Sequence, residues 1–430
     1  MTTERLRRRA FRGFLVIRAV DEVSVQMLTV AISWYVYAVT HNPMSLAFVG
    51  LARFLPNLGI VLIAGQAADR FNRRRIIGLS LFLQALCGAG FSVLCASGSH
   101  IQLIYLLLIF LGAAQAFAAP ALSATLPHLV TEEEFPRSVA TVSSAFQICS
   151  LAGPALGGVI YAVSGPGAFA ASALLYLLAL TQVRRLADDG QVGRVEINVA
   201  ADHGVLAGAR YIRSNRLLLS MISLDLFAVL LGGVTALLPI YAKDILAAGP
   251  AGLGCLRCAP GVGAAIIGLV LAHRTIQNRA GRMMLGCVAG FGLSTVVFAL
   301  STKLWLSLVA LGAAGGFDMV SMVIRQTLVQ VATPDSMRGR VSAVQWVFIG
   351  ASSELGEFES GATAALFGTM PAALLGGLGT LMVVAIWSRI FPELRRADML
   401  TVNRTADVSR TENEVRYGTV SDQPSVAEAD

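Results

Sequence analysis

Long apolar runs alternate with short polar segments along most of the chain. Each run holds about 18–27 residues, the length at which a helix rising ~1.5 Å per residue crosses a ~30 Å hydrocarbon core. Glycine, proline and charged residues separate one run from the next. The pattern predicts twelve membrane helices, at 11–40, 44–68, 76–97, 101–126, 139–163, 167–183, 217–241, 253–272, 283–301, 304–327, 341–367 and 371–388.

Composition agrees with a polytopic membrane protein. Of the 430 residues, 55% are hydrophobic, the 42 glycines add about a tenth more, and only 14% are charged. In soluble domains, apolar residues with glycine included make up roughly 45–50% and charged residues about 25%. A soluble enzyme, a secreted disulfide scaffold and a disordered protein are therefore disfavoured. The six cysteines all lie in apolar runs, which favours buried thiols over a disulfide framework.

Basic residues gather at the ends of the apolar runs, so the net charge of +7 describes membrane orientation and does not indicate nucleic-acid binding. The predicted outer loops hold only Lys243 and Lys303, whereas arginines crowd the N-terminus and the alternate loops. We therefore expect both termini to be cytoplasmic. We expect a monomer whose partners are the lipid bilayer, protons and a small molecule, without nucleic acid.

The two halves of the chain resemble each other. The segment 131–141 (TEEEFPRSVAT) precedes the fifth predicted helix, and 333–343 (TPDSMRGRVSA) precedes the eleventh. Parallel six-helix repeats are typical of two bundles around a central cavity. The predicted organisation is a bundle at 1–183, a cytoplasmic linker at 184–216, a bundle at 217–388 and a polar tail at 389–430. Within the linker, 205–217 reads equally well as a surface amphipathic helix or as a solvated connector.

Two motifs resemble those of the major facilitator superfamily. The loop after the second predicted helix reads GQAADRFNRRR from Gly65 to Arg75, and the fifth helix carries GPALGG from Gly153 to Gly158. The first helix and the 10–11 loop are similar to the branch that includes enterobactin-type siderophore exporters, described as transmembrane secretion effectors. The resemblance implies an all-α fold of two pseudo-symmetric six-helix bundles in a bacterial inner membrane.

The resemblance also implies roles for the two motifs. The first would be a latch that holds the bundles together on the cytoplasmic side; its residues are Gly65, Asp69, Arg70, Arg73 and Arg74. The alternative is that the arginines only anchor the chain at the membrane surface. The second would be an antiporter-type motif formed by Gly153, Pro154, Gly157 and Gly158, with a plain packing kink as the alternative. Leu108 stands where many proton-coupled drug exporters carry an arginine, and Cys149 stands where the full motif has a glycine.

Ionisable residues inside the apolar runs are candidates for proton coupling or substrate binding, because inserting each costs about 2.5–3.5 kcal/mol. They are Arg18, Asp21, Glu22, Arg53, Asp225, Asp318, Arg325, Glu354, Glu357 and Glu359. Glu354 and Glu357 share a helix face, whereas Glu359 points elsewhere. The alternative is that these acids only form structural pairs with Arg53, Arg257 or Arg325.

The pattern favours a proton-coupled exporter of a small polar or anionic metabolite, siderophore-like, that works by alternating access. A broad-specificity multidrug efflux pump and a nutrient uptake symporter are the alternatives, and a non-transporting membrane sensor or scaffold is a more distant one. The chain carries no Walker A motif and no catalytic, metal or cofactor signature. We therefore expect a transporter and not an enzyme, with no cofactor and no metal.

Overall fold

The computed structural model describes residues 2–98, 101–131, 133–186, 204–273 and 279–397. Regular structure in these ranges is helical throughout, with no β-strand. The long helices are α1 (Thr2–Thr40), α2 (Pro43–Arg70), α3 (Arg73–Ser97), α4 (Ile101–Leu129), α5 (Phe135–Val163), α6 (Gly165–Val183), α8 (Arg216–Gly232), α10 (Gly249–His273), α11 (Ala280–Leu300), α12 (Leu304–Ala332), α13 (Asp335–Phe367) and α14 (Thr369–Ile390). The shorter ones are α7 (Gly204–Ser214), η2 (Thr235–Leu237), α9 (Leu238–Ile240), η3 (Tyr241–Ile245) and α15 (Pro392–Arg396).

Polar side chains cap several helices where the chain turns. The Asn42 side chain accepts the Met44 N–H at the start of α2, and Asn72 accepts the Arg75 N–H at the start of α3. Ser164 caps α6 in the same way. Each cap satisfies a backbone donor that the first helical turn leaves unpaired, so the apolar runs end close to their predicted positions.

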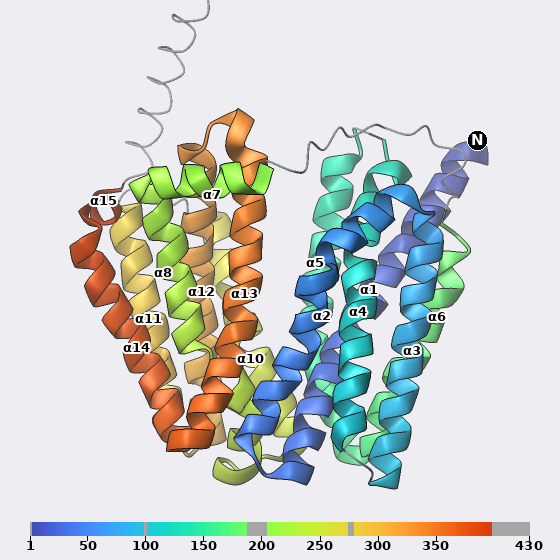
Figure 1. Cartoon of the computed structure of the whole chain (residues 1–430), viewed down its shortest axis with the longest axis horizontal. Coiled ribbons are helices and arrows are strands. Elements are labelled where there is room, and N and C mark those ends of the chain that lie inside the picture. Colours follow the sequence, from blue (N-terminus) through green and yellow to red (C-terminus); the bar gives the residue numbers. More distant parts are fainter. Residues whose placement is uncertain (1, 99–100, 132, 187–203, 274–278, 398–430) are drawn as a thin grey trace, which may run out of the picture.

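The long helices form two groups that lie side by side (Figure 1). Helices α1 to α6 pack among themselves, through pairs such as α2 with α4 and α3 with α6. Helices α8 and α10 to α14 form the second group, through pairs such as α10 with α12 and α11 with α14. We call these groups the N-terminal and C-terminal bundles.

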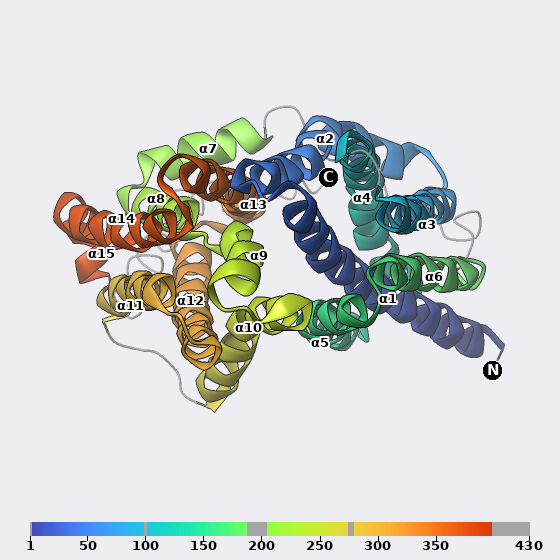
Figure 2. The ribbon, with the colours of Figure 1, turned by 90° about the horizontal axis from the view of Figure 1, so that it is seen from below.

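The bundles meet mainly through α5 with α10 and α2 with α13, which lie next to each other when the molecule is seen from the end opposite α7 (Figure 2). Their closest contacts lie near that end, which we call the far end. Gly361 of α13 packs against Ala47 at the start of α2, and a Cβ on Gly361 would lie 2.8 Å from the Ala47 Cβ. Toward α7 the ribbons of the two bundles diverge (Figure 1). The bundles are therefore joined at the far end and separated at the α7 end.

The prediction of one continuous helix over 217–241 is wrong. Helix α8 ends at Gly232, and the chain continues through η2, α9 and the π-helical turn η3. Two adjacent glycines favour the break, because glycine is a poor helix former. The freed Gly233 carbonyl accepts the Ser360 hydroxyl from α13 at 2.5 Å, so the break is held by a contact from another helix.

The predicted amphipathic segment at 205–217 forms α7, which crosses the ends of the C-terminal bundle (Figure 1). Ile212 is buried, and the Tyr211 hydroxyl donates to the Ala332 carbonyl at 3.4 Å. Arg210 and Arg213 are exposed. The segment is a packed surface helix and not a solvated connector, and it stops at Asn215, whose side chain caps α8.

Nine of the described segments are long and apolar enough to cross a membrane. Helices α1, α2 and α13, which hold the predicted first, second and eleventh spans, are not among them. These three helices also carry several of the charged residues inside apolar runs, including Asp21, Arg53 and Glu354. The all-helical membrane fold is confirmed, whereas the count of twelve spans stays a prediction.

Candidate functional site

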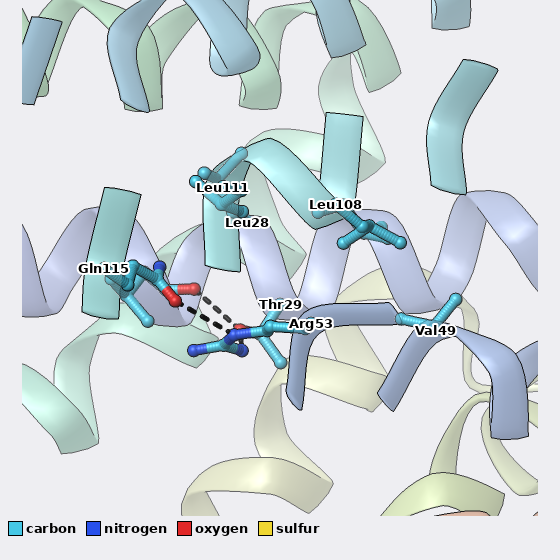
Figure 3. A pocket seen from close by; sticks show the side chains of 9 residues that line it. Leu28, Thr29, Val49, Arg53, Leu108, Leu111 and Gln115 are labelled. Carbon is cyan, nitrogen blue, oxygen red and sulfur yellow. Dashed lines mark hydrogen bonds between the residues drawn. The ribbon is translucent and has the colours of Figure 1, made fainter. Parts of the chain in front are cut away.

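Arg53 of α2 points into a small cavity inside the N-terminal bundle, next to α1 and α4 (Figure 3). Its Nε donates to Gln115 Oε1 at 3.1 Å, and its Nη1 donates to Thr29 Oγ1 at 2.9 Å. Apolar side chains, including Leu108 and Leu111 of α4, line the rest of the cavity. The guanidinium is thus hydrogen-bonded to neutral groups in an apolar setting.

Arg257 of α10 reaches the same helix from the other bundle. Its Nη2 donates to Ser33 Oγ of α1 at 3.4 Å. Thr29 and Ser33 are four residues apart, so they lie one turn apart on one face of α1, a rise of about 6 Å. Both hydroxyls donate to backbone carbonyls of their own helix, Thr29 to Val25 and Ser33 to Thr29. Their lone pairs therefore face the two arginines, and α1 holds a guanidinium from each bundle on successive turns.

Glu354 and Glu357 of α13 lie against α2 at Gly50, one turn before Arg53. A Cβ built on Gly50 would lie 3.6 Å from Glu357 Oε2 and 3.9 Å from Glu354 Oε2. Glu354 is within electrostatic range of Glu357, Arg53 and Arg257, and Glu357 is within electrostatic range of Arg257. The prediction that these two acids share a face is confirmed. We call Arg53, Arg257, Glu354 and Glu357 the central charge cluster; it spans both bundles.

The remaining candidates on α1 and α13 are arranged differently. The Arg18 guanidinium lies 5.8 Å from the centre of the Phe146 ring. Glu22 accepts the Gln26 amide at 2.8 Å, and Asp21 has a buried oxygen, Oδ1, without a hydrogen-bond partner in the described part of the chain. Glu359 accepts the hydroxyl of Thr363 of its own helix at 2.7 Å, away from the central charge cluster.

Asp225 and Arg325 form an ion pair inside the C-terminal bundle, between α8 and α12. Their side chains are 11% and 5% exposed, so solvent screens the pair little. Asp318 lines the same small cavity as Asp225, together with Phe291 and Ser321. Arg325 therefore neutralises an acid of its own bundle and not the acids of α13.

The helix-5 motif is a packing surface on two sides. Gly153 and Gly157 face α1, where Cβ atoms would lie 2.5 Å from the Gln26 Cβ and 2.8 Å from the Met27 Cα. Gly158 faces the other bundle, where its Cβ would lie 3.0 Å from the Gly254 Cα. The motif thus brings α5 close to α1 and also closes the contact between the bundles at the far end.

The predicted latch residues lie at the α7 end, where the bundles diverge. Arg73 donates to the Ala124 carbonyl at 3.2 Å and Arg74 to the Arg184 carbonyl at 3.3 Å, both within the N-terminal bundle, and Arg70 is exposed. A Cβ on Gly65 would meet nothing within 4 Å, so no described segment packs closely against Gly65 in this conformation. The Asp69 side chain lies outside the described part.

Sequence reasoning missed the neutral partners of the arginines. Thr29 and Ser33 lie four residues apart in an apolar helix, and this spacing is the signal that was available. It also missed a group of contacts at the far end. There the Tyr37 hydroxyl of α1 donates to the Asp244 carboxylate of η3, and Lys243 Nζ lies 3.0 Å from His41 Nε2.

Comparison with known proteins gives consistent relatives. A family model described as transmembrane secretion effector matches residues 2–420. The enterobactin exporter of Citrobacter koseri is 27% identical over 399 residues, which covers 90% of this chain and 93% of that protein. An Escherichia coli enterobactin exporter is 27% identical over 412 residues, with coverage of 93% and 96%.

Solved structures support the fold alone. A bacterial homologue of the human lysosomal transporter Spinster, in an inward-facing and occupied conformation, superposes with a TM-score of 0.69 at 11% identity. It covers 90% of this chain and 98% of that one. The nucleoside transporter NupG also gives a TM-score of 0.69 at 11% identity, with coverage of 89% and 99%.

Proposed function

Because the chain belongs to the transmembrane secretion effector family of the major facilitator superfamily, we propose that it is a proton-coupled exporter of a small polar or anionic metabolite. A siderophore-like molecule is the substrate class that the enterobactin exporters support. The family assignment makes the protein a membrane transporter, and coupling and substrate are the proposed part.

The central charge cluster is the observation that carries this proposal. It joins two acids of α13 to arginines of α2 and α10, so its contacts change if the bundles rock. Ionisable side chains inside a membrane bundle commonly mark ion and substrate pathways. Carboxylates that exchange a proton beside arginines give the coupling, and the arginines favour an anionic substrate.

The contact pattern supports alternating access as the proposed mechanism. The α7 end carries the arginine-rich loops, and we assign it to the cytoplasm, with both termini on that side. The present conformation is then open toward the cytoplasm. Rocking of residues 1–183 against 217–388 closes the α7 end and engages the latch at Asp69 and Arg70, with 184–216 as the linker and 389–430 as the tail.

A transport assay tests the proposal. The full-length protein is reconstituted into liposomes with an imposed pH gradient, and enterobactin is supplied on one side. We expect enterobactin to drive proton movement in the opposite direction, reported by a trapped pH dye.

The direction of flux separates the alternatives. Movement of enterobactin and protons in the same direction indicates an uptake symporter, and equal flux with many unrelated apolar cations indicates a multidrug pump. Enterobactin that never moves protons contradicts the proposed coupling. Protein-free liposomes and the Glu357→Gln variant are the controls.

A further inference from the structure

We propose that the outer face of α7, with the start of α13 beside it, binds the headgroup of an anionic phospholipid. Three exposed arginines form this surface, Arg210 and Arg213 of α7 and Arg340 of α13, and we call it the α7 basic surface. The inference goes beyond the proposed function, because it concerns a lipid held by the C-terminal bundle and not the transported molecule.

Helix α7 has two chemically different faces. Its inner face packs against α13 and α8, where Ile212 is buried and the Tyr211 hydroxyl donates to the Ala332 carbonyl. Residues three apart in a helix share a face, so the exposed Arg210 and Arg213 lie together on the outer face. The sequence of α7 contains no acidic residue. A helix with one packed face and one arginine face is suited to lie at a membrane surface.

The third arginine lies alongside α7 because the backbones of α7 and α13 approach closely. A Cβ on Gly208 of α7 would lie 2.7 Å from the Arg340 carbonyl oxygen, so a larger residue at this position would push α7 away. The Arg340 side chain is exposed, and its Nη1 lies 3.6 Å from the sulfur of Met337, a neutral group. The start of α13 therefore adds a third exposed guanidinium at the edge of α7.

The three arginines are not neutralised by the protein. Among the residues that the structure describes, none of the three forms an ion pair with an acid. Arg216, which follows α7 directly, does form one, with Glu393 at 3.1 Å. Like charges on one surface repel each other, and a bound anion reduces that repulsion. Phosphate oxygens match the two-pronged donor geometry of a guanidinium group.

The position of α7 favours a phospholipid as the anion. Asn215 caps α8 directly after α7, and the apolar segment Arg216–Ile245 begins there. Helix α7 therefore lies at the depth where a membrane helix meets the bilayer surface. Seen along the bundles, α7 forms the outer edge of the C-terminal bundle, beside α8 and α13 (Figure 2). Lipid headgroups occupy that depth and that edge, and basic segments next to a membrane span attract anionic lipids.

A bound headgroup holds α7 at the membrane surface. Helix α7 in turn packs on α13, whose later turns carry Glu354 and Glu357. The lipid thus stabilises the packing of the linker helix on the C-terminal bundle from outside the transport path.

Lipid titration of the purified full-length protein in an uncharged detergent tests the site. Native mass spectrometry counts bound phosphatidylglycerol and bound phosphatidylcholine with the same acyl chains, which differ in net headgroup charge. We expect phosphatidylglycerol to bind more tightly, with a difference that shrinks as the ammonium acetate concentration rises. Each arginine near an anionic lipid surface contributes about fivefold in affinity, so Arg210→Gln combined with Arg213→Gln is expected to weaken phosphatidylglycerol binding about 25-fold and to leave phosphatidylcholine binding unchanged.

Arg9 and Arg12 of α1 provide a matched control. They are also exposed, three residues apart and at the α7 end, but they belong to the N-terminal bundle (Figure 1). Arg9→Gln combined with Arg12→Gln is expected to keep phosphatidylglycerol affinity within about twofold of wild type, because these arginines lie outside the α7 basic surface. An equal loss in both double variants shows that the lipid responds to net charge alone, and overturns the site. Equal affinity of the wild type for the two lipids also overturns it.

Two soluble probes separate a lipid from other anions. Glycerophosphoglycerol carries the same headgroup without acyl chains, and a hexaglutamate peptide represents an acidic protein segment. Both are expected to bind more weakly than phosphatidylglycerol, because neither gains contact with the apolar surface of the bundle. Equal binding of glycerophosphoglycerol would assign the surface to a soluble phosphate. Tighter binding of hexaglutamate that is lost in the α7 variant would assign it to an acidic protein, and either result overturns the lipid assignment.

Discussion

Two groups of buried charge differ in how they are neutralised. Asp225 and Arg325 pair directly inside one bundle. The central charge cluster spans both bundles, and its arginines are hydrogen-bonded to the neutral groups Thr29, Gln115 and Ser33. The ion pair between α8 and α12 stays intact only while these two helices keep their present packing. The central charge cluster is instead shared between two bundles, and its arginines carry no direct ion pair in the described part of the chain.

The comparison separates a structural role from a transport role. An ion pair within a rigid bundle stays together when the bundles rock, so it neutralises itself in every state. In the proposed rocking motion, the acids and arginines of the central charge cluster would change their separation. Deep burial of an ionisable residue therefore does not by itself indicate function, whereas its position relative to the moving interface does.

The largest loss of folding stability is expected from breaking the Asp225–Arg325 ion pair. Arg325→Met leaves the Asp225 carboxylate buried without a partner, which typically costs about 3–5 kcal/mol. The double variant Asp225→Leu with Arg325→Met is expected to recover most of this, because apolar side chains replace a buried ion pair well. Thermal unfolding in detergent measures both. A double variant as unstable as the single one would place Asp225 in a role other than pairing.

Glu357 of the central charge cluster and Asp21 of α1 are expected to behave in the opposite way. Glu357→Gln and Asp21→Asn are expected to leave expression and unfolding temperature close to wild type and to reduce substrate-driven proton flux to the protein-free background, since each removes a carboxylate that can carry a proton. Flux in liposomes and the unfolding temperature are measured on the same preparations. Glu133→Gln on an exposed loop is the matched control. Wild-type flux in either variant removes that acid from the mechanism.

The bundle contact itself is expected to show an intermediate effect. Gly254→Ala places a Cβ 2.6 Å from the Pro154 carbonyl oxygen, and such overpacking costs about 1–3 kcal/mol. The cost falls on the state in which the far end is closed, so hydrogen exchange near Tyr37 and Gly50 is expected to rise. Gly65→Ala is the control for stability, because nothing lies within 4 Å of its Cβ position. A similar rise in both would show that exchange does not report the contact.

The helices followed from the sequence because apolar runs and their breaks are local properties. The shared face of Glu354 and Glu357 followed equally well from a spacing of three residues. The break after Gly232 was not predicted, since hydropathy continues through Val234 to Ile240 and masks the signal of the two adjacent glycines; the contact from Ser360 that holds the break comes from a distant helix.

The partners of the charges depend on how helices rotate against one another, which spacing along the chain does not report. The sequence left Arg325 as a possible partner of the acids of α13. In the structure Arg325 forms its ion pair with Asp225 of α8. Arg18 precedes Asp21 and Glu22 by one turn of α1, and its guanidinium also lies over the Phe146 ring of α5, a neighbour that spacing in α1 does not report. Thr29 and Ser33 are small polar residues of an apolar helix. Their role as hydrogen-bond acceptors for Arg53 and Arg257 depends on the packing of α2 and α10 against α1.

The smallest effect is expected from an exposed version of the direct pair. Arg216 Nη1 and Glu393 Oε1 lie 3.1 Å apart, with side chains 73% and 38% exposed. A hydrogen bond from its own backbone N–H, helped by Arg216, lowers the pKa of Glu393. A lowered carboxyl pKa stabilises the fold above the unfolded-state pKa, and this contribution is lost as pH falls through the lowered value. Arg216→Gln should therefore melt slightly below wild type at pH 7, and the two curves should converge on acidification and at high salt. If Arg216→Gln lowers stability as much as Arg325→Met, exposure does not separate the two pairs, and burial is not what makes the Asp225–Arg325 pair strong.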